Sequence, residues 1–204
     1  MAGRERFSYP FPFYAPILRT QAGSVAAMLS SWIFLALLLF WAVGAYNRIV
    51  RLRSAAIQAF GGLDAHLMRM MAMLGEYEAA QGPAPTAQAD ARAALWAATT
   101  QFGASLAVAR ARPLDAGAAA ALLTGREVLE AAWLAMVRAS EVPEAPADGA
   151  ALPLWAQRWQ ELVAQNALAT RQFNDAALQY NHAIGQFPAR LLAWLFGFKA
   201  ARTL

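Results

Sequence analysis

An uncharged apolar run near the start of the chain limits the possible folds more than any other feature. Residues 25–45 read VAAMLSSWIFLALLLFWAVGA and contain no Asp, Glu, Lys, Arg or His. A helix of this length matches the ~30 Å hydrocarbon core of a bilayer. We therefore predict a transmembrane helix over residues 25–45, preceded by a leader rich in proline and aromatic residues over 1–24.

A cleaved signal peptide is the alternative interpretation of the same run. Val43, Gly44 and Ala45 supply small residues at a plausible cleavage point. Retention in the mature protein is favoured because the run is longer than the apolar core of a usual signal peptide, and because the helical pattern continues beyond it. The retained form is a single-pass protein of the cell (inner) membrane.

Three arginines follow the run closely, at Arg48, Arg51 and Arg53. We expect them to form a collar at the membrane surface, and specific binding of anionic lipid is the alternative. The leader also carries three arginines, against one glutamate, so the positive-inside count is nearly balanced. Both orientations therefore stay open, with the body in the cytoplasm or facing the envelope.

The remaining charge is too evenly balanced for binding to a polyanion. The net charge is +4, but residues 1–53 hold six arginines and one glutamate, while residues 54–204 hold eleven basic and twelve acidic side chains. A near-neutral body releases few counterions, so nucleic acid is not an expected partner. The absence of cysteine excludes a disulfide framework, a thiolate zinc site and a thiol nucleophile.

Beyond the apolar run the sequence is helical in pattern throughout. Apolar residues from Ile49 to Leu74 recur at intervals of three and four, as on one buried face of a helix. Proline and glycine punctuation gives four helices, over about 46–80, 86–112, 116–142 and 153–187. We predict an all-α fold in which the transmembrane helix continues into an antiparallel up-down bundle of about four helices over 46–188. Gly61-Gly62 suggests a kink or a close helix contact in the first of them.

The last segment, residues 189–204, is an aromatic tail. Up-down packing returns it to the membrane, so we expect Trp194 at the level of the lipid headgroups. In the competing interpretation the tail caps the bundle against its first helix. We define the membrane-proximal ring as the predicted interface made by six residues: Arg48, Arg51, Arg53, Trp194, Phe196 and Phe198.

Two asparagines lie seven residues apart on the last long helix, at positions 174 and 181. This spacing places Asn174 and Asn181 on one side of the helix, with Tyr180 beside them. We predict a structural polar network that fixes the register of this helix against the first one, where Asp64 is one of the residues that can answer. A ligand-binding groove is the alternative.

No arrangement of residues in the sequence indicates catalysis. His66 and His182 are the two histidines, and neither belongs to a Glu-x-x-His or His-x-x-x-His pattern. Glycine-rich phosphate loops and serine nucleophiles in a recognisable turn are also missing. We predict no catalytic residues, no metal and no cofactor, and we interpret Trp96, Trp133, Trp155 and Trp159 as core residues rather than a cofactor cage.

The end of the chain resembles the C-terminal signature of the LemA family of membrane-anchored helical proteins. The likeness rests on Arg171–Asp175, Tyr180–Pro188 and Leu195–Lys199, and more moderately on residues 46–50 and 60–69. Typical relatives have Trp where Phe60 stands, so the resemblance is to a divergent member. It implies a membrane anchor and a helical bundle, and it implies no particular reaction.

Together these features predict a non-enzymatic, membrane-anchored bundle that is a scaffold or interaction platform. Its expected partners are the lipid bilayer and other membrane or envelope proteins. The alternative is a ligand-sensing bundle that reads a small molecule between its first and last helices. Such a sensor needs a partner protein, because nothing in the sequence resembles a kinase or cyclase output.

Overall fold

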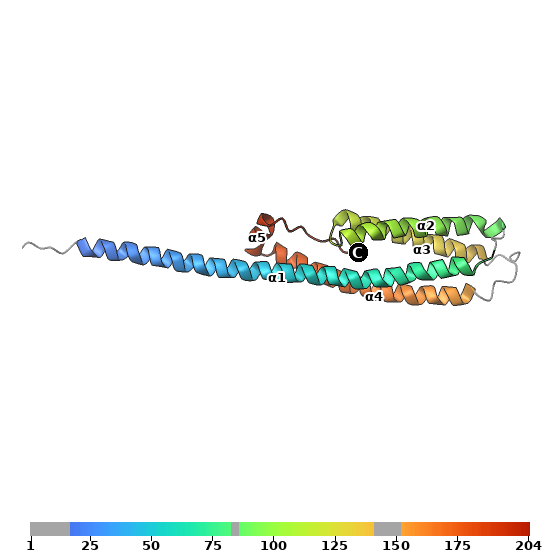
Figure 1. Ribbon diagram of the computed structural model, residues 1–204, viewed down its shortest axis with the longest axis horizontal. Coiled ribbons are helices and arrows are strands. Elements are labelled where there is room, and N and C mark those ends of the chain that lie inside the picture. Colours follow the sequence, from blue (N-terminus) through green and yellow to red (C-terminus); the bar gives the residue numbers. More distant parts are fainter. Residues whose placement is uncertain (1–16, 83–85, 141–151) are drawn as a thin grey trace, which may run out of the picture. The chain divides into compact units, whose positions relative to one another are not determined.

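The computed structural model describes residues 17–82, 86–140 and 152–204, and within these ranges the chain forms five helices and no strand (Figure 1). The helices are α1 (Ile17–Ala80), α2 (Thr86–Ala111), α3 (Ala116–Ser140), α4 (Leu152–Gly185) and α5 (Ala189–Leu195). The predicted all-α class is confirmed. The proline-rich part of the leader and the segment 141–151, which joins the third and fourth predicted helices, lie outside the described residues.

The chain divides into two compact units, residues 1–44 and 45–204. In the first unit, α1 contains a segment that is long and apolar enough to cross a membrane. Its large apolar side chains from Met28 to Val43 are all exposed. The hydroxyls of Ser30 and Ser31 donate to the carbonyl oxygen of Ala27, at 2.9 and 2.8 Å, so both serines are satisfied inside the helix.

In the second unit, α1, α2, α3 and α4 pack as a helical bundle around one core. The predicted buried face of α1 is confirmed, because the buried residues recur at three and four along it: Ile49, Ala56, Phe60, Leu63, Leu67, Met70 and Leu74. Phe60 meets Phe173 of α4 edge to face, with ring centroids 5.7 Å apart. The first and last bundle helices are therefore in direct contact.

The glycines in close helix contacts are not the ones that the sequence suggested. A Cβ atom at Gly61 or Gly62 would meet nothing within 4 Å, so the close contact expected there is wrong. A Cβ at Gly103 of α2 would lie 2.8 Å from Met71 Cε, and one at Gly125 of α3 would lie 3.2 Å from Ser105 Oγ. These two glycines let α2 approach α1 and α3 approach α2.

The bundle end near the α1–α2 turn is filled by four aromatic side chains, which we call the aromatic cluster: Tyr77, Trp133, Trp155 and Trp159. The Trp133 ring stacks on Trp159 at 5.0 Å, and Tyr77 meets Trp133 and Trp155 edge to face at 5.4 and 5.8 Å. This cluster joins α1, α3 and α4. Trp96 differs from the expected core role, because its side chain is 58% exposed on α2.

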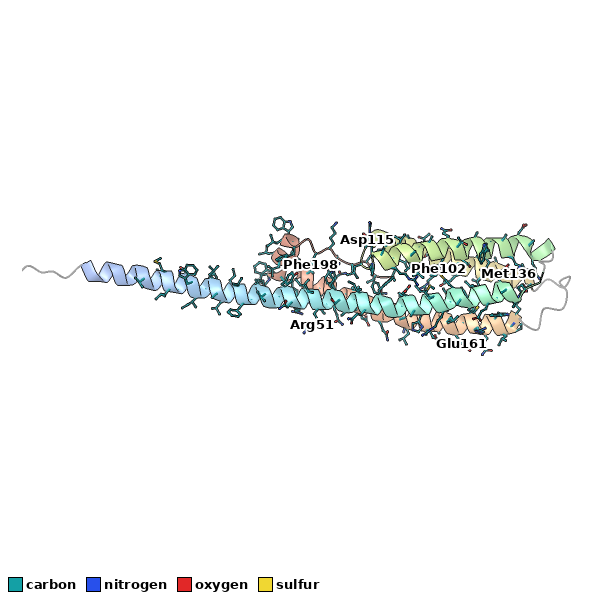
Figure 2. The ribbon with its side chains drawn as sticks, in the orientation of Figure 1. Arg51, Phe102, Asp115, Met136, Glu161 and Phe198 are labelled. Carbon is teal, nitrogen blue, oxygen red and sulfur yellow. The ribbon has the colours of Figure 1, made fainter. Side chains whose placement is uncertain are left out.

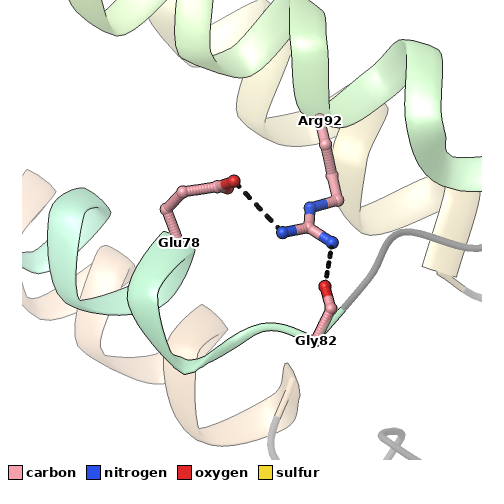
Figure 3. A network of polar contacts seen from close by, with 3 residues as sticks. All are labelled: Glu78, Gly82 and Arg92. Carbon is pink, nitrogen blue, oxygen red and sulfur yellow. Dashed lines mark hydrogen bonds and ion pairs between the residues drawn. The ribbon is translucent and has the colours of Figure 1, made fainter.

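A polar network joins the end of α1, with Gly82 just beyond it, to α2 (Figure 3). Arg92 donates to the carbonyl oxygen of Gly82 at 2.7 Å and to Glu78 Oε1 at 3.1 Å. The Arg92 side chain is only 12% exposed, so this pair is less screened than a surface ion pair. The network therefore ties the end of α1 to the first turns of α2.

Candidate functional site

The chain reverses direction after α5, and the reversal depends on one glycine. Gly197 has a φ of +69°, in the left-handed region. The amide of Phe198 donates to the Ala193 carbonyl at 2.9 Å, and that of Gly197 donates to the Trp194 carbonyl at 3.3 Å. This hydrogen-bond pair is a Schellman motif, which closes the helix and sends the following residues back along the bundle.

The returning residues are held by side chains of α4, in an arrangement that we call the tail clamp. Asn181 Nδ2 donates to the Ala201 carbonyl at 2.7 Å, and its Oδ1 accepts from the Ala201 amide at 2.8 Å. Asn174 makes the same two bonds to Leu204, at 2.6 and 2.8 Å. The Tyr180 hydroxyl donates to the Lys199 carbonyl at 2.9 Å. Side-chain amides thus replace a neighbouring strand as partners for the tail backbone.

Spacing explains why two asparagines suit this task. Seven residues of helix rise by about 10 Å, at about 1.5 Å per residue. Three residues of extended chain, from Ala201 to Leu204, also cover about 10 Å, at about 3.3 Å per residue. Each amide therefore meets a backbone amide and carbonyl of one tail residue, and the tail runs antiparallel to α4.

The predicted polar network has a different partner from the one expected. Asn174, Tyr180 and Asn181 do share one side of α4, as the spacing predicted. Their hydrogen bonds go to the tail backbone rather than to α1. Asp64 lies apart from this network, because its Oδ1 accepts from Arg110 Nε of α2 at 2.7 Å. Sequence reasoning missed the tail because backbone groups leave no signature in the side-chain pattern.

Aromatic residues of the tail contact the start of the second unit. Phe196 and Phe198 lie against Tyr46 of α1, with ring centroids 5.0 and 6.0 Å apart. Trp194 does not join them, because its side chain is 83% exposed. Of the membrane-proximal ring, the structure therefore brings the two phenylalanines onto α1, as a cap would, and leaves Trp194 facing outward.

The three arginines of the ring, Arg48, Arg51 and Arg53, are exposed on α1. Figure 2 shows the Arg51 side chain pointing away from the bundle. Arg53 acts on Tyr180: burial raises the pKa of the Tyr180 hydroxyl, and the positive charge of Arg53 lowers that pKa in part. The Tyr180 hydroxyl therefore stays protonated at neutral pH and remains a donor to the tail.

The two histidines show no arrangement suited to a metal. His66 Nδ1 lies 3.3 Å from Arg69 on the same helix, and His182 Nε2 lies 2.6 Å from Gln186, which follows the last residue of α4. Within the described ranges, no group of three or more His, Cys, Asp or Glu side chains could hold a metal ion.

A buried amide in the middle of the core was not predicted. Asn166 is 3% exposed, and its Nδ2 donates to the sulfur of Met70 at 3.3 Å. Its Oδ1 atom is buried and has no hydrogen-bond partner among the described residues. Thioether sulfur is a weak acceptor, so this amide is poorly satisfied and weakens the contact between α1 and α4.

No family model matches the sequence, and no curated protein or solved structure matches it. The resemblance to the LemA family stays a prediction from the residues quoted above. Three of those residues, Asn174, Tyr180 and Asn181, make the tail clamp.

Proposed function

We propose that the chain is a single-pass membrane protein, anchored by residues 25–45, whose bundle is a non-enzymatic platform for other membrane or envelope proteins. The observation that carries the proposal is the exposure of every large apolar side chain from Met28 to Val43. Burying one such side chain is worth about 1.5–3 kcal/mol. A run of this length in water is therefore strongly unfavourable, and a bilayer removes that penalty.

A second apolar surface supports contact between the α5 region and a membrane. Five large side chains there are more than half exposed: Phe187, Leu191, Trp194, Leu195 and Phe196. Contiguous exposed apolar side chains indicate an interaction surface. Tryptophan is suited to the headgroup region because its ring is apolar and its N–H is polar. This surface is the proposed second membrane contact of the chain.

The platform role is supported by exposed apolar residues on the bundle and by the LemA resemblance. Trp96 of α2 is 58% exposed and Leu134 of α3 is 50% exposed. Tryptophan is enriched among the residues that dominate protein interfaces. Trp96 is therefore the proposed anchor for a protein partner.

Membrane anchoring is tested by extracting vesicles that contain the full chain with alkaline carbonate. Leu35→Arg combined with Leu38→Arg places two charges inside the apolar run, at about 2.5–3.5 kcal/mol each, and should release the protein into the soluble fraction. Leu168→Arg, on an exposed site of α4, is the matched control and should stay in the membrane. Retention of the double variant would overturn the anchor.

The second membrane contact is tested with a unique label, since the chain has no cysteine. A polarity-sensitive fluorophore on Trp194→Cys should report an apolar surrounding in vesicles. The same fluorophore on Trp96→Cys, also at an exposed site, should report water. Equal, water-like emission at both positions would show that Trp194 lies off the membrane.

The platform role is tested by placing a photo-crosslinking amino acid at Trp96 in cells. Discrete adducts with one or a few membrane proteins are expected from position 96. The control position is Glu161, which is exposed on α4 (Figure 2). The same adducts from both positions, or none from position 96, would argue against a partner surface on α2.

A further inference from the structure

A cavity of about 660 Å³ opens beside the tail, within the second unit. Three segments that are distant in the sequence border it: α1 with Tyr46 and Arg53, the α2–α3 turn with Arg112, and the tail with Phe198 and Lys199. Its volume falls in the ~300–1,000 Å³ range of small-molecule sites. The cavity is therefore large enough for a polar headgroup, and it is separate from the aromatic cluster.

Positive charge converges on this cavity. Arg53, Arg112 and Lys199 line it, each from a different segment. Among the described residues, the ion pairs of the chain involve none of these three side chains. Like charges brought together repel one another, and an anion between them removes that repulsion.

One carboxylate also lines the cavity, and it is already engaged. Asp115 Oδ2 accepts from the amide of Ala118 at 2.9 Å, as the cap of α3. In Figure 2, Asp115 lies at the end of α2 and α3 that is nearer to Phe198. The lining therefore carries three cationic groups against one capping carboxylate, so the cavity favours an anion.

The tail clamp holds one of the three cations, Lys199, in place. Tyr180 binds the carbonyl of Lys199, and Asn181 binds Ala201 two residues later. Because the backbone of the tail is fixed on both sides of Ala200, Lys199 needs little further ordering to meet a ligand. A preorganised cation suits a multiply charged oxyanion such as phosphate.

The rim of the cavity indicates where the phosphate comes from. Tyr46, Phe196 and Phe198 line the cavity with aromatic rings, and the exposed apolar surface around Trp194 directly precedes Phe198 in the chain. Tyr46 comes directly after the apolar run in the sequence. Cationic groups beside aromatic and apolar ones match a molecule with a charged head and an apolar body.

We propose that this cavity binds the phosphate-bearing headgroup of an anionic phospholipid. The inference rests on the proposed function, since it requires residues 25–45 to lie in a bilayer. Arg53, Arg112 and Lys199 contact the phosphate, and the aromatic rim contacts the glycerol and the first carbons of the acyl chains.

The test uses the full chain in nanodiscs of phosphatidylcholine, with and without phosphatidylglycerol. Phosphatidylglycerol should raise the melting temperature and remain bound in native mass spectrometry. Arg112→Gln combined with Lys199→Gln should weaken this binding about tenfold for each cation removed. Arg112→Lys combined with Lys199→Arg keeps the charges and should retain the effect.

The matched control is Arg190→Gln, an exposed cation on α5 that does not line the cavity. It should keep the response to phosphatidylglycerol. An equal loss in this variant would show general attraction to an anionic surface and overturn the cavity. Undiminished binding in the double glutamine variant would overturn it as well.

Inorganic phosphate, added to the detergent-solubilised chain at matched ionic strength, distinguishes the two sources of phosphate. A higher melting temperature with inorganic phosphate and an unchanged one with phosphatidylglycerol would overturn the lipid assignment. Carbonate extraction of vesicles that contain the full chain separates the two proposals. A chain that is embedded but indifferent to phosphatidylglycerol contradicts this inference alone, whereas a chain that is extracted contradicts the proposed function.

Discussion

The two ends of the bundle are closed by different means. At the end near the α1–α2 turn, Tyr77, Trp133 and Trp159 fill the space between helices with buried rings. At the end near α5, an extended tail lies on α4, and Asn174 and Asn181 satisfy its backbone. The first closure depends on buried apolar area, which is spread over many contacts. The second depends on a few directional bonds, so single polar atoms control it.

Trp133→Ala should lower the unfolding free energy most, because it removes the ring that contacts both Tyr77 and Trp159. Trp133 is 2% exposed, and truncation of such a side chain costs about 3–5 kcal/mol of unfolding free energy. The measurement is guanidinium unfolding of the full chain in mild detergent. Trp96→Ala, at an exposed site, should change this free energy by less than about 0.5 kcal/mol. Similar losses in both variants would contradict the separate role of the aromatic cluster.

Asn181→Ala should loosen the tail and leave the aromatic cluster intact. Two hydrogen bonds to Ala201 are lost, which together are worth about 1–3 kcal/mol. Hydrogen exchange followed by mass spectrometry should show lost protection in residues 199–204 and unchanged protection around Trp133. Gln179→Ala, at an exposed position of the same helix, is the control and should leave the tail protected. Loss of protection at both ends would mean that the two closures are one cooperative unit.

Gly197→Ala should act on the same end through the backbone. An alanine in the left-handed region costs about 1–2 kcal/mol, and Gly197 has a φ of +69°. Gly62→Ala is the opposite case, since its Cβ would meet open space inside a helix. That change should stabilise the chain by about 0.5–1 kcal/mol. Thermal unfolding of the two variants in detergent compares them, and a stabilising Gly197→Ala would show that the reversal after α5 is not needed.

Tyr180 makes the α5 end sensitive to alkali. Its folded pKa is raised above the ordinary 10.0, mainly by burial, so its contribution to stability is complete below pH 10 and is lost as the pH rises above that value. Tyr180→Phe removes one hydrogen bond, worth about 1 kcal/mol near neutral pH, and should flatten the alkaline decline of the melting temperature. Because burial also raises the pKa of Tyr77, Tyr77→Phe is the companion variant. An unchanged decline in both variants would assign the alkaline loss to other groups.

The sequence predicted the helices well because their signals are local. Asp115 precedes α3 and binds the amide of Ala118, and Pro153 lies in the first turn of α4. The apolar spacing from Ile49 to Leu74 also identified the face of α1 that is buried. Each of these features depends on residues within a few positions of one another.

The site was harder to predict, because its partners are distant in the sequence and partly backbone. The seven-residue spacing of Asn174 and Asn181 identified a polar face on α4, but nothing in the spacing names Ala201 and Leu204 as partners. The cavity gathers Arg53, Arg112 and Lys199 from three segments that only the fold brings together. The glycines in close helix contacts could not be predicted for a similar reason. Gly103 makes room for Met71 of α1, whereas Gly62 faces open space.

The equal rise of seven residues of α4 and three residues of the tail also fixes the register of the tail. An inserted residue between Lys199 and Ala201 would leave the tail about 3.3 Å out of phase with the two amides. The tail therefore tolerates changes of side chain more readily than changes of length, because both amides bind its backbone.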